Sequence, residues 1–433
     1  MSDVRTSSRT RIPRTALVAV VALATAATTT SASGSAAPST PPGKGPGPAW
    51  SASPVLPDDS VMTDSVRPGG HTVWAAGMTA VRDANGGLVG FAPAMWERNE
   101  RKDTGRKGAG RKGAGRNNTG WNGTGWYDTG WKRLATAPVP AGDHVRFNAV
   151  DASSPRDGLV VGDYAESLGG IVTQHWNGRK WRTALVPVPE GTRNAGFLSV
   201  DHLDSHNAWA TGWTAAPPSA GLPDRPLLQH WNGTKWRQAD LPDLGEGPGG
   251  GFEVNGVSAG GRRDVWAVGG ISTAKETKPL ALRFDGSRWK KAALPPVGDA
   301  PAWLEAVVTA PDGTAWAVGQ TRPPGGGRFG FVLRYDGKRW SEVALPEGTP
   351  VLSSVALSEG EPVVFAGAGR SGFSVLRRTG GRWTSMDLPA TLGGAPLRTW
   401  NVAARGNAVD VLATLPQVDD RLLAPQVVLT ARR

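Results

Sequence analysis

The amino-acid sequence of 433 residues predicts an all-β fold, a seven-bladed β-propeller of four-stranded antiparallel blades. Two observations predict it. A hairpin motif recurs along the chain: an aromatic residue, then Asn-Gly or Asp-Gly, two further residues and Trp. An apolar segment that ends in Gly precedes each hairpin, and the whole repeat is about 50 residues long, which is typical of a propeller blade. Complete copies of the motif occupy residues 176–181, 231–236, 284–289 and 335–340.

The hairpin motif predicts the form of its own turn. Asn-Gly and Asp-Gly favour the type I′ turn, because both central residues of that turn take positive φ. The aromatic residues that flank the turn are then expected to face each other across two antiparallel strands, as Trp176 would face Trp181.

The order of elements is clearest in the fourth repeat. Its first strand is expected at 254–257, and its second strand, at 264–269, ends in Gly. A variable loop leads to a third strand at 280–284, and the fourth strand begins at Trp289. Four antiparallel strands in sequence order make one blade.

The second strand of each repeat carries an apolar residue three positions before its final Gly. Because every occupant is apolar, we expect this position to form the core between blades. The occupants are Trp74, Leu159, Trp209, Trp266, Trp316, Val364 and, in the last repeat, Leu412.

The spacing of the hairpin Trp residues predicts how the ring closes. Six of them, from Trp131 to Trp383, follow one another at intervals of 43 to 55 residues, and a seventh would fall near residue 433. A segment at 49–57 resembles the fourth strand that begins at Trp340. An N-terminal outer strand around Trp50 is therefore expected to complete the last blade, which would remove two exposed sheet edges.

The strand and hairpin motifs resemble those of known propeller families. Asp-Val-Trp-Ala-Val-Gly at 264–269 and Asp-Gly-x-x-Trp at 285–289 resemble repeats of the Kelch or galactose-oxidase type and of Asp-box (BNR-like) propellers. Exported actinobacterial propellers without an assigned activity resemble the chain over 49–433. The resemblance implies that these motifs are structural and that ligands meet the face formed by the variable loops or the central channel.

Three segments are predicted along the chain. An Arg-rich start precedes an apolar run at 16–27, which is the layout of a secretory signal peptide over residues 1–37. Residues 38–48 are rich in Pro and Gly and are expected to be a spacer, and residues 49–433 form the propeller. Cysteine is absent, which excludes disulfides. We therefore expect an exported soluble monomer without a cofactor or membrane span, either secreted or associated with the cell wall.

The net charge of +11 comes mostly from two short segments. Residues 1–37 carry a net +3 and residues 98–133 a net +7, so the remainder is close to neutral. The second segment contains a basic, Gly-rich insertion with Trp residues at 101–130, expected in the hairpin of blade 1. Such a segment suits weak binding of anionic polymers, because Lys and Arg neutralise charge and Trp stacks. The alternative is a tolerated loop without a function.

Most Trp residues take a repeated structural position, but Trp213, Trp303 and Trp400 do not. Each is expected near the variable loops or in an innermost strand. An exposed Trp there could stack on a sugar ring or on an aromatic or cationic ligand, so these three are the candidate ligand-binding residues. The alternative is that they fill the tops of the blades.

The sequence assigns no catalytic or metal site. His202 and His206 lie in a short segment rich in Asp and His that is expected to be a solvated turn, so no metal is predicted. His175 and His230 take one position in successive repeats, where Arg follows in later ones, which favours a packing role. A glycosidase needs two converging carboxylates. The candidates near the variable loops are Glu166, Asp224, Glu253 and Glu305.

Three functions stay open on this basis. The first is a secreted, non-catalytic propeller that binds an extracellular glycan, peptide or protein through its variable loop face. The second is a carbohydrate-active hydrolase or lyase on the same scaffold, and the third is a structural cell-surface protein. The sequence has no zinc-protease, phosphate-loop or nucleophile-elbow motif, which favours a protein without enzymatic activity.

Overall fold

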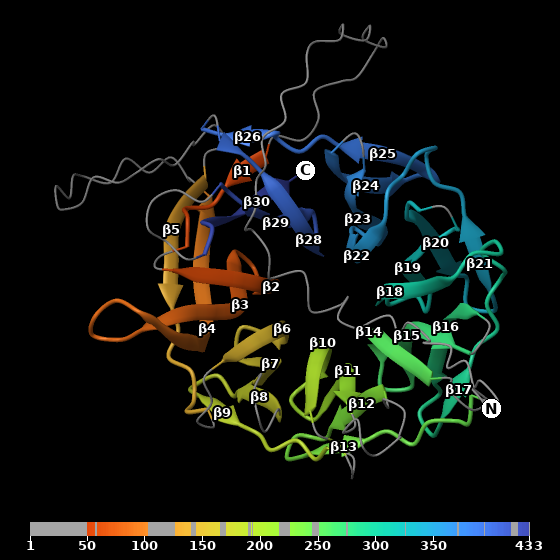
Figure 1. Ribbon diagram of the computed structural model, residues 1–433, viewed down its shortest axis with the longest axis horizontal. Coiled ribbons are helices and arrows are strands. Elements are labelled where there is room, and N and C mark those ends of the chain that lie inside the picture. Colours follow the sequence, from red (N-terminus) through yellow and green to blue (C-terminus); the bar gives the residue numbers. More distant parts are fainter. Residues whose placement is uncertain are drawn as a thin grey trace, which may run out of the picture. The chain divides into compact units, whose positions relative to one another are not determined.

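Figure 1 shows a ring of seven four-stranded antiparallel sheets in the computed structural model. Residues Pro46–Arg433 form one compact unit. The predicted signal peptide and spacer lie outside the described residues. The structure describes residues 50–56, 59–102, 126–139, 144–164, 170–188, 192, 194–215, 226–244, 251–273, 276–324, 326–369, 372–393, 395–416 and 423–432.

Blades 1 to 6 start at an innermost strand and move outward in sequence order, as do the first three strands of blade 7. Blade 1 is β2 (Ser60–Gly69), β3 (Thr72–Arg82), β4 (Leu88–Lys102) and β5 (Trp126–Arg133). Blade 2 is β6 (Val145–Ser154), β7 (Asp157–Tyr164), β8 (Gly170–Trp176) and β9 (Trp181–Thr183). Blade 3 is β10 (Asn194–Asp204), β11 (Asn207–Ala215), β12 (Pro226–Trp231) and β13 (Trp236–Gln238).

The remaining blades follow the same plan. Blade 4 is β14 (Gly251–Gly261), β15 (Asp264–Ser272), β16 (Thr277–Phe284) and β17 (Trp289–Lys291). Blade 5 is β18 (Ala302–Thr309), β19 (Ala315–Thr321), β20 (Phe329–Tyr335) and β21 (Trp340–Val343). Blade 6 is β22 (Leu352–Ser358), β23 (Glu361–Gly369), β24 (Gly372–Thr379) and β25 (Arg382–Met386). A small hairpin of β26 (Thr391–Leu392) and β27 (Ala395–Pro396) precedes blade 7, which is β28 (Arg398–Arg405), β29 (Ala408–Thr414), β30 (Gln426–Arg432) and β1 (Trp50–Ala52).

The N-terminal strand closes the ring, as predicted. β1 pairs antiparallel with β30, with Trp50 opposite Ala431, and so becomes the outermost strand of blade 7. The indole Nε1 of Trp50 also donates a 2.9 Å hydrogen bond to the backbone oxygen of Asp387, beyond β25. The closing strand therefore contacts both blade 7 and the end of blade 6.

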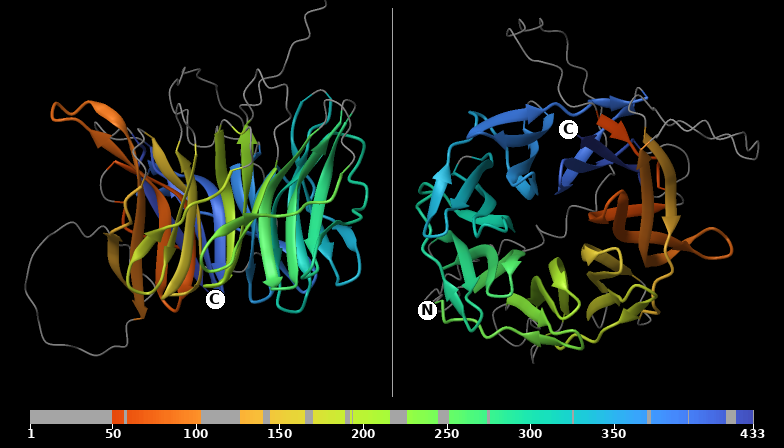
Figure 2. Two further views of the ribbon diagram at one scale, coloured as in Figure 1. Left: turned by 90° about the horizontal axis from the view of Figure 1, so that it is seen from below. Right: turned by 180° about the vertical axis from the view of Figure 1, so that it is seen from behind.

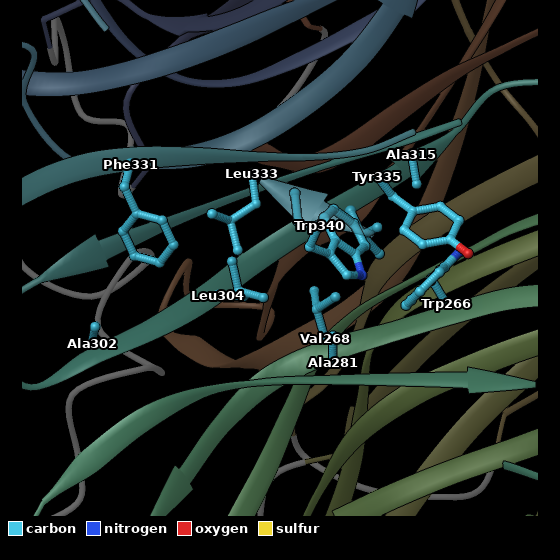
Figure 3. Close-up of a cluster of buried hydrophobic side chains, with 12 residues drawn as sticks. Trp266, Val268, Ala281, Ala302, Leu304, Ala315, Phe331, Leu333, Tyr335 and Trp340 are labelled. Carbon is cyan, nitrogen blue, oxygen red and sulfur yellow. The ribbon is translucent and has the colours of Figure 1, made fainter. Parts of the chain in front are cut away.

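The core lies between neighbouring blades. Trp266 on β15 meets Trp340 of the next blade edge to face, with ring centroids 4.9 Å apart, and Trp209 meets Trp289 in the same way at 5.1 Å. Figure 3 shows the first of these clusters, in which side chains of blade 4 pack against those of blade 5. Because Trp266 is only 1% exposed, its burial stabilises the fold by roughly 2–3 kcal/mol. The predicted core role of this Trp position is confirmed.

Two blades depart from the predicted core position, blade 6 by one residue and blade 7 by two. In blades 1 to 5 the final Gly of the second strand pairs with the residue before a bulge in the first strand, as Gly269 does with Val254. Ala366 and Ala413 take that place in blades 6 and 7. The residues three positions earlier are therefore Val363 and Asp410 rather than Val364 and Leu412. Val364 and Leu412 are 0% and 1% exposed in the core between blades, so their predicted core role is confirmed, but the equivalent position of blade 7 holds the buried Asp410.

The hairpin turns differ from the predicted type I′ turn. The aromatic residues do pair, as Trp176 does with Trp181, and four residues lie between them. Of these four, only Gly178 takes positive φ, at 83°. The Oδ1 of Asn177 instead accepts hydrogen bonds from the backbone N–H groups two and three residues later, at 3.1 and 3.0 Å. The Asn or Asp of the motif therefore acts through its side-chain oxygen, as in an Asx turn.

The predicted insertion at 101–130 begins and ends in strand. Lys102 at the end of β4 pairs with Trp126 at the start of β5, so the hairpin arms of blade 1 extend into the segment. Residues 103–125 lie outside the described residues.

The antiparallel order gives the ring two faces, which Figure 2 shows from the side. We call the turn face the one that holds the hairpin turns and the turns between first and second strands. The loop face holds the loops between second and third strands and the connections between blades. In the described part of the chain, no helix has the length and hydropathy needed to cross a bilayer.

Candidate functional site

Every first strand carries a bulge near the loop face. A bulge leaves one residue without a partner and re-aims its side chain, and bulges are common beside functional sites. Glu305 and Trp400, both candidates from the sequence, occupy this position in their blades. The seven bulge residues are Thr63, Asn148, Leu198, Asn255, Glu305, Ser353 and Trp400.

Three bulge side chains tie one blade to the next. Thr63, Asn148 and Asn255 each donate to the backbone oxygen of the residue before the bulge in the following blade, at 2.7, 2.8 and 2.9 Å. These bonds satisfy carbonyl groups that the bulges free from the sheet ladder. An ionised Glu305 has no donor for such a bond, so blade linkage does not explain its presence at this position.

Glu305 stands in a polar cluster on β18 and β19. The indole Nε1 of Trp303 donates to its Oε1 at 2.7 Å, and the amide of Gln320 donates to the same oxygen. Arg328, in the following loop, donates from Nη1 to Oε1 of Gln320 at 3.4 Å. Gln320 is 6% exposed, so the cluster is largely removed from water.

Burial raises the pKa of Glu305 above its usual range. The hydrogen bonds from Gln320 and Trp303 and the charge of Arg328 oppose this shift, but the loss of hydration outweighs them. The carboxyl therefore keeps its proton to a higher pH than an ordinary Glu. Such a group can donate a hydrogen bond to a bound molecule or act as a general acid.

A second polar cluster lies on β6 and β7. Arg146 contacts Asp163 through Nε and Nη2, at 2.9 Å to Oδ1 and 3.3 Å to Oδ2. Asn148 donates to Oδ2 of the same carboxylate at 2.8 Å. Asp163 is 2% exposed, so this buried charge depends on the Arg146 guanidinium and the Asn148 amide.

Gly196 on β10 separates this cluster from Trp213. A Cβ atom at Gly196 would lie 2.8 Å from Oδ2 of Asp163 and 3.1 Å from Nε1 of Trp213. Only a glycine leaves the carboxylate and the indole this close to the same backbone. The close approach brings Trp213 of blade 3 beside the charged pair of blade 2.

The three predicted ligand-binding Trp residues come from alternate blades and have different surroundings. Trp213 and Trp303 are partly buried beside the two polar clusters. Trp400 is partly buried too, but it packs against the apolar cluster of Leu56, Met62, Ala75, Ala94, Trp96, Leu412 and Val428. The surroundings of Trp400 thus match the alternative of a packing role.

The four carboxylates predicted as candidates for a catalytic pair do not share one environment. Glu166 and Asp224 lie outside the described residues. Glu253 on β14 is exposed and lies opposite Gly270, whereas Glu305 of the next blade is largely withdrawn from water. Trp303 comes close to the same Gly270, because a Cβ there would meet Cβ of Trp303 at 3.0 Å.

The interpretation of His202 as part of a solvated turn is wrong. Its side chain is fully buried, and burial lowers its pKa, so the ring is neutral near pH 7. His206, in contrast, is exposed and bonded to Ser205. His202 instead meets Asp157 and His175 of the preceding blade. Alignment of the repeats places Asp157 next to His175 within one blade. The contact of His202 with this pair comes from the next blade, and the spacing of residues in the sequence does not predict it.

Comparison with known proteins identifies no family for this chain. No protein-family model matches the chain, and no curated protein does, so the resemblance to Kelch and Asp-box repeats stays a prediction. A polysaccharide lyase described as an ulvan lyase is 10% identical, covers 88% of this chain and 94% of its own, and has a TM-score of 0.48. A lectin of Aleuria aurantia, in complex with Fucα1-6GlcNAc, is 14% identical and covers 78% of this chain and 100% of its own, with a TM-score of 0.41. A protein of unknown function from Dyadobacter fermentans is 14% identical, covers 64% and 92%, and has a TM-score of 0.41. At these identities and TM-scores the solved structures assign no activity to this chain.

Proposed function

We propose that the protein is an exported, non-catalytic propeller that binds an extracellular glycan, peptide or protein through its loop face. One observation carries the proposal. The residue after the second-strand Gly is Asp163, Trp213 and Gln320 in blades 2, 3 and 5. Blade 4 has Gly270 at this position, so a blade does not need a polar or aromatic side chain there.

The chemistry of this position suits recognition. Buried polar groups reduce stability unless they are fully paired, and functional sites are among the places where proteins keep them. Arg146 with Asp163 offers a donor and acceptor pair, and Trp303 with Glu305 offers an aromatic surface beside a carboxyl of raised pKa. Sugars and peptides are bound by this combination of stacking surface and directional hydrogen bonds.

The test is a binding screen with the chain from residue 38 onward. Glycan and peptide arrays first identify ligands of the unchanged protein, and affinities are then measured for Trp213→Ala, Trp303→Ala, Trp400→Ala and the triple variant. Trp176→Phe, on the turn face, is the matched control. We expect Trp213→Ala and Trp303→Ala to weaken binding about tenfold or more, as truncation of an aromatic anchor does. If the folded triple variant keeps full affinity for every ligand, this site assignment fails.

A carbohydrate-active hydrolase or lyase is the second candidate, and the raised pKa of Glu305 favours it. A general acid needs a pKa near the working pH, and burial moves Glu305 in that direction. Incubation with polysaccharides should then release reducing ends or unsaturated products, and Glu305→Gln should abolish the release. A purely structural cell-surface protein, the third candidate, would show neither turnover nor saturable binding.

We also propose weak binding of polyanions by the segment 101–130. Its charge comes from Lys and Arg among Gly and Trp, and this composition predicts affinity that falls steeply with salt. Replacing 103–125 with Asn-Gly keeps the pairing of Lys102 with Trp126 and should abolish heparin retention at low salt. The melting temperature should stay nearly unchanged, since hairpin tips accept insertions.

A further inference from the structure

Three side chains from two blades converge on the turn face. Asp157 begins β7, His175 lies near the end of β8, and His202 lies near the end of β10 in the next blade. The Oδ1 of Asp157 is 2.8 Å from Nε2 of His175 and 3.2 Å from Nε2 of His202. One ligand atom of each residue lies within 4.8 Å of the other two.

The surrounding hydrogen bonds hold these groups in place. Ser153 donates from Oγ to Oδ2 of Asp157 at 2.7 Å, which turns Oδ1 toward the two imidazoles. The backbone N–H of His202 donates to Oδ2 of Asp151 at 2.6 Å, which fixes β10 beside blade 2. Bonds of this kind orient the ligands of protein metal sites.

Blades 3 and 4 have a residue pair equivalent to Asp157 and His175, but they have no His equivalent to His202 beside it. In blade 3 the equivalent pair is Asn207 with His230, at 2.8 Å, and in blade 4 it is Asp264 with Arg283, at 2.9 Å. Pairing with the second strand shows that the residue corresponding to His202 is Ala259 in blade 4 and Thr309 in blade 5. The pair of blade 3 therefore faces Ala259, and the pair of blade 4 faces Thr309. A pair is thus enough for blade packing, and packing does not explain His202.

We propose that Asp157, His175 and His202 bind a zinc-type divalent cation that joins blades 2 and 3 at the turn face. Two imidazole nitrogens and one carboxylate oxygen are ligands that Zn²⁺ accepts in a tetrahedral site. With bonds of about 2.0–2.1 Å, the ligands of such a site lie roughly 3.3 Å apart. The two measured separations, 2.8 and 3.2 Å, lie within about half an ångström of that spacing.

The burial of the three side chains suits a site with one position open to water. His202 is fully buried, whereas the side chains of His175 and Asp157 are 15% and 16% exposed. A cation could therefore enter from the turn face and take water as its fourth ligand. The bound cation would link the second and third strands of blade 2 to the first strand of blade 3 and resist their separation.

The experiment measures Zn²⁺ binding to the chelator-treated chain from residue 38, prepared without a polyhistidine tag. Isothermal titration should give one Zn²⁺ per chain, and Co²⁺ should give the visible absorption of a tetrahedral site. His175→Gln and Asp157→Asn should each weaken binding about a hundredfold or more, since each removes a ligand. Zn²⁺ should also raise the melting temperature of the unchanged chain but not that of Asp157→Asn.

Two variants serve as matched controls. His230→Gln changes the same repeat position in the next blade, and His206→Gln removes an exposed His close to His202. Both should bind one Zn²⁺ with unchanged affinity, and far-UV circular dichroism confirms that every variant is folded. The proposal is overturned if the unchanged chain binds no stoichiometric Zn²⁺, or if folded His175→Gln binds it equally well.

Discussion

Arg67 on β2 and Asp410 on β29 form a buried ion pair between the first and the last blade. The Nη2 of Arg67 lies 2.6 Å from Oδ1 of Asp410, and the two side chains are 3% and 1% exposed. Glu100 contacts the same guanidinium at 3.0 Å, and Thr430 donates to Asp410 at 2.6 Å. A charge network therefore crosses the seam between blades 1 and 7, from β2 and β4 to β29 and β30, while β1 pairs with blade 7 as its outermost strand.

Breaking this pair should destabilise the protein strongly. Asp410→Asn and Arg67→Met should each lower the free energy of unfolding by about 3–5 kcal/mol, because one buried charge loses its main partner. The double variant Arg67→Met/Asp410→Asn should lose less than the two single losses combined. Equilibrium unfolding in urea measures all three. As a control, Arg262→Met disrupts the exposed Arg262–Asp204 pair and should cost about 1 kcal/mol or less. Additive losses would show that the two charges do not interact.

Removal of the closing strand should expose an edge of blade 7. A chain that starts at residue 57 lacks β1 and the bond from the backbone N–H of Ser53 to Val428, 2.8 Å long. It also lacks Leu56, which is 2% exposed in the core. We expect a lower melting temperature and concentration-dependent association, because β30 then presents unpaired backbone groups. Light scattering compares it with a chain that starts at residue 46. A monomer of unchanged stability would contradict this role of β1.

Two hairpin glycines form a matched pair. Gly286 and Gly337 have φ of 96° and 95°, so Ala strains both turns by about 1 kcal/mol. At Gly286 a Cβ would also lie 2.8 Å from Cγ of Arg263, whereas nothing lies within 4 Å at Gly337. Gly286→Ala should therefore destabilise the protein more than Gly337→Ala in chemical denaturation. Equal losses would mean that Arg263 moves aside at no cost.

Stability should fall as pH rises toward neutrality. Burial and the nearby Asp151 raise the pKa of Asp201 from its ordinary value of 3.8 to about 7. Because the folded protein holds this proton more tightly than the unfolded chain, the stabilisation is complete below about pH 4 and disappears as pH passes 7. Its full size is on the order of 4 kcal/mol.

The variant Asp201→Asn separates this effect from other titrations. Asn stays uncharged throughout and can still accept the hydrogen bond that Asp201 receives from the backbone N–H of Ala259, 3.0 Å long. Urea unfolding between pH 4 and 8 should show a shallower decline for the variant than for the unchanged chain. Both proteins keep Asp151 and His202, so the difference reports on residue 201 together with its interaction with Asp151. Parallel pH profiles would rule out a raised pKa for Asp201.

The repeat architecture was predictable because its signals are local. The pairing of Trp176 with Trp181 and the core position of Trp266 follow from motif spacing that each blade repeats. The turn type was mispredicted because Asn177 acts through its side chain, which composition does not reveal. In blade 7 the core position was assigned to Leu412 instead of Asp410, because Ala413 replaces the Gly that marks the same place in blades 1 to 5.

The candidate site was predictable only in part. Trp213 and Trp303 stood out because no repeated role explained them. Their partners did not, since the approach of Trp213 to Asp163 depends on a glycine in another strand. The convergence of His175 and His202 depends on the packing of one blade against the next.

By itself, the sequence determined the all-β class, the number of blades and the strand that closes the ring. Hairpin turns and strand patterns depend on residues that are close together in the sequence, so the sequence of one chain is enough to recognise them. Only the tertiary structure decided which side chains meet across blades: Arg67 with Asp410, Trp303 with Glu305, and Asp157 with two imidazoles. The register between blades is set by the bulges and by the packing of whole sheets, and a shift of one residue moves a side chain to the opposite face.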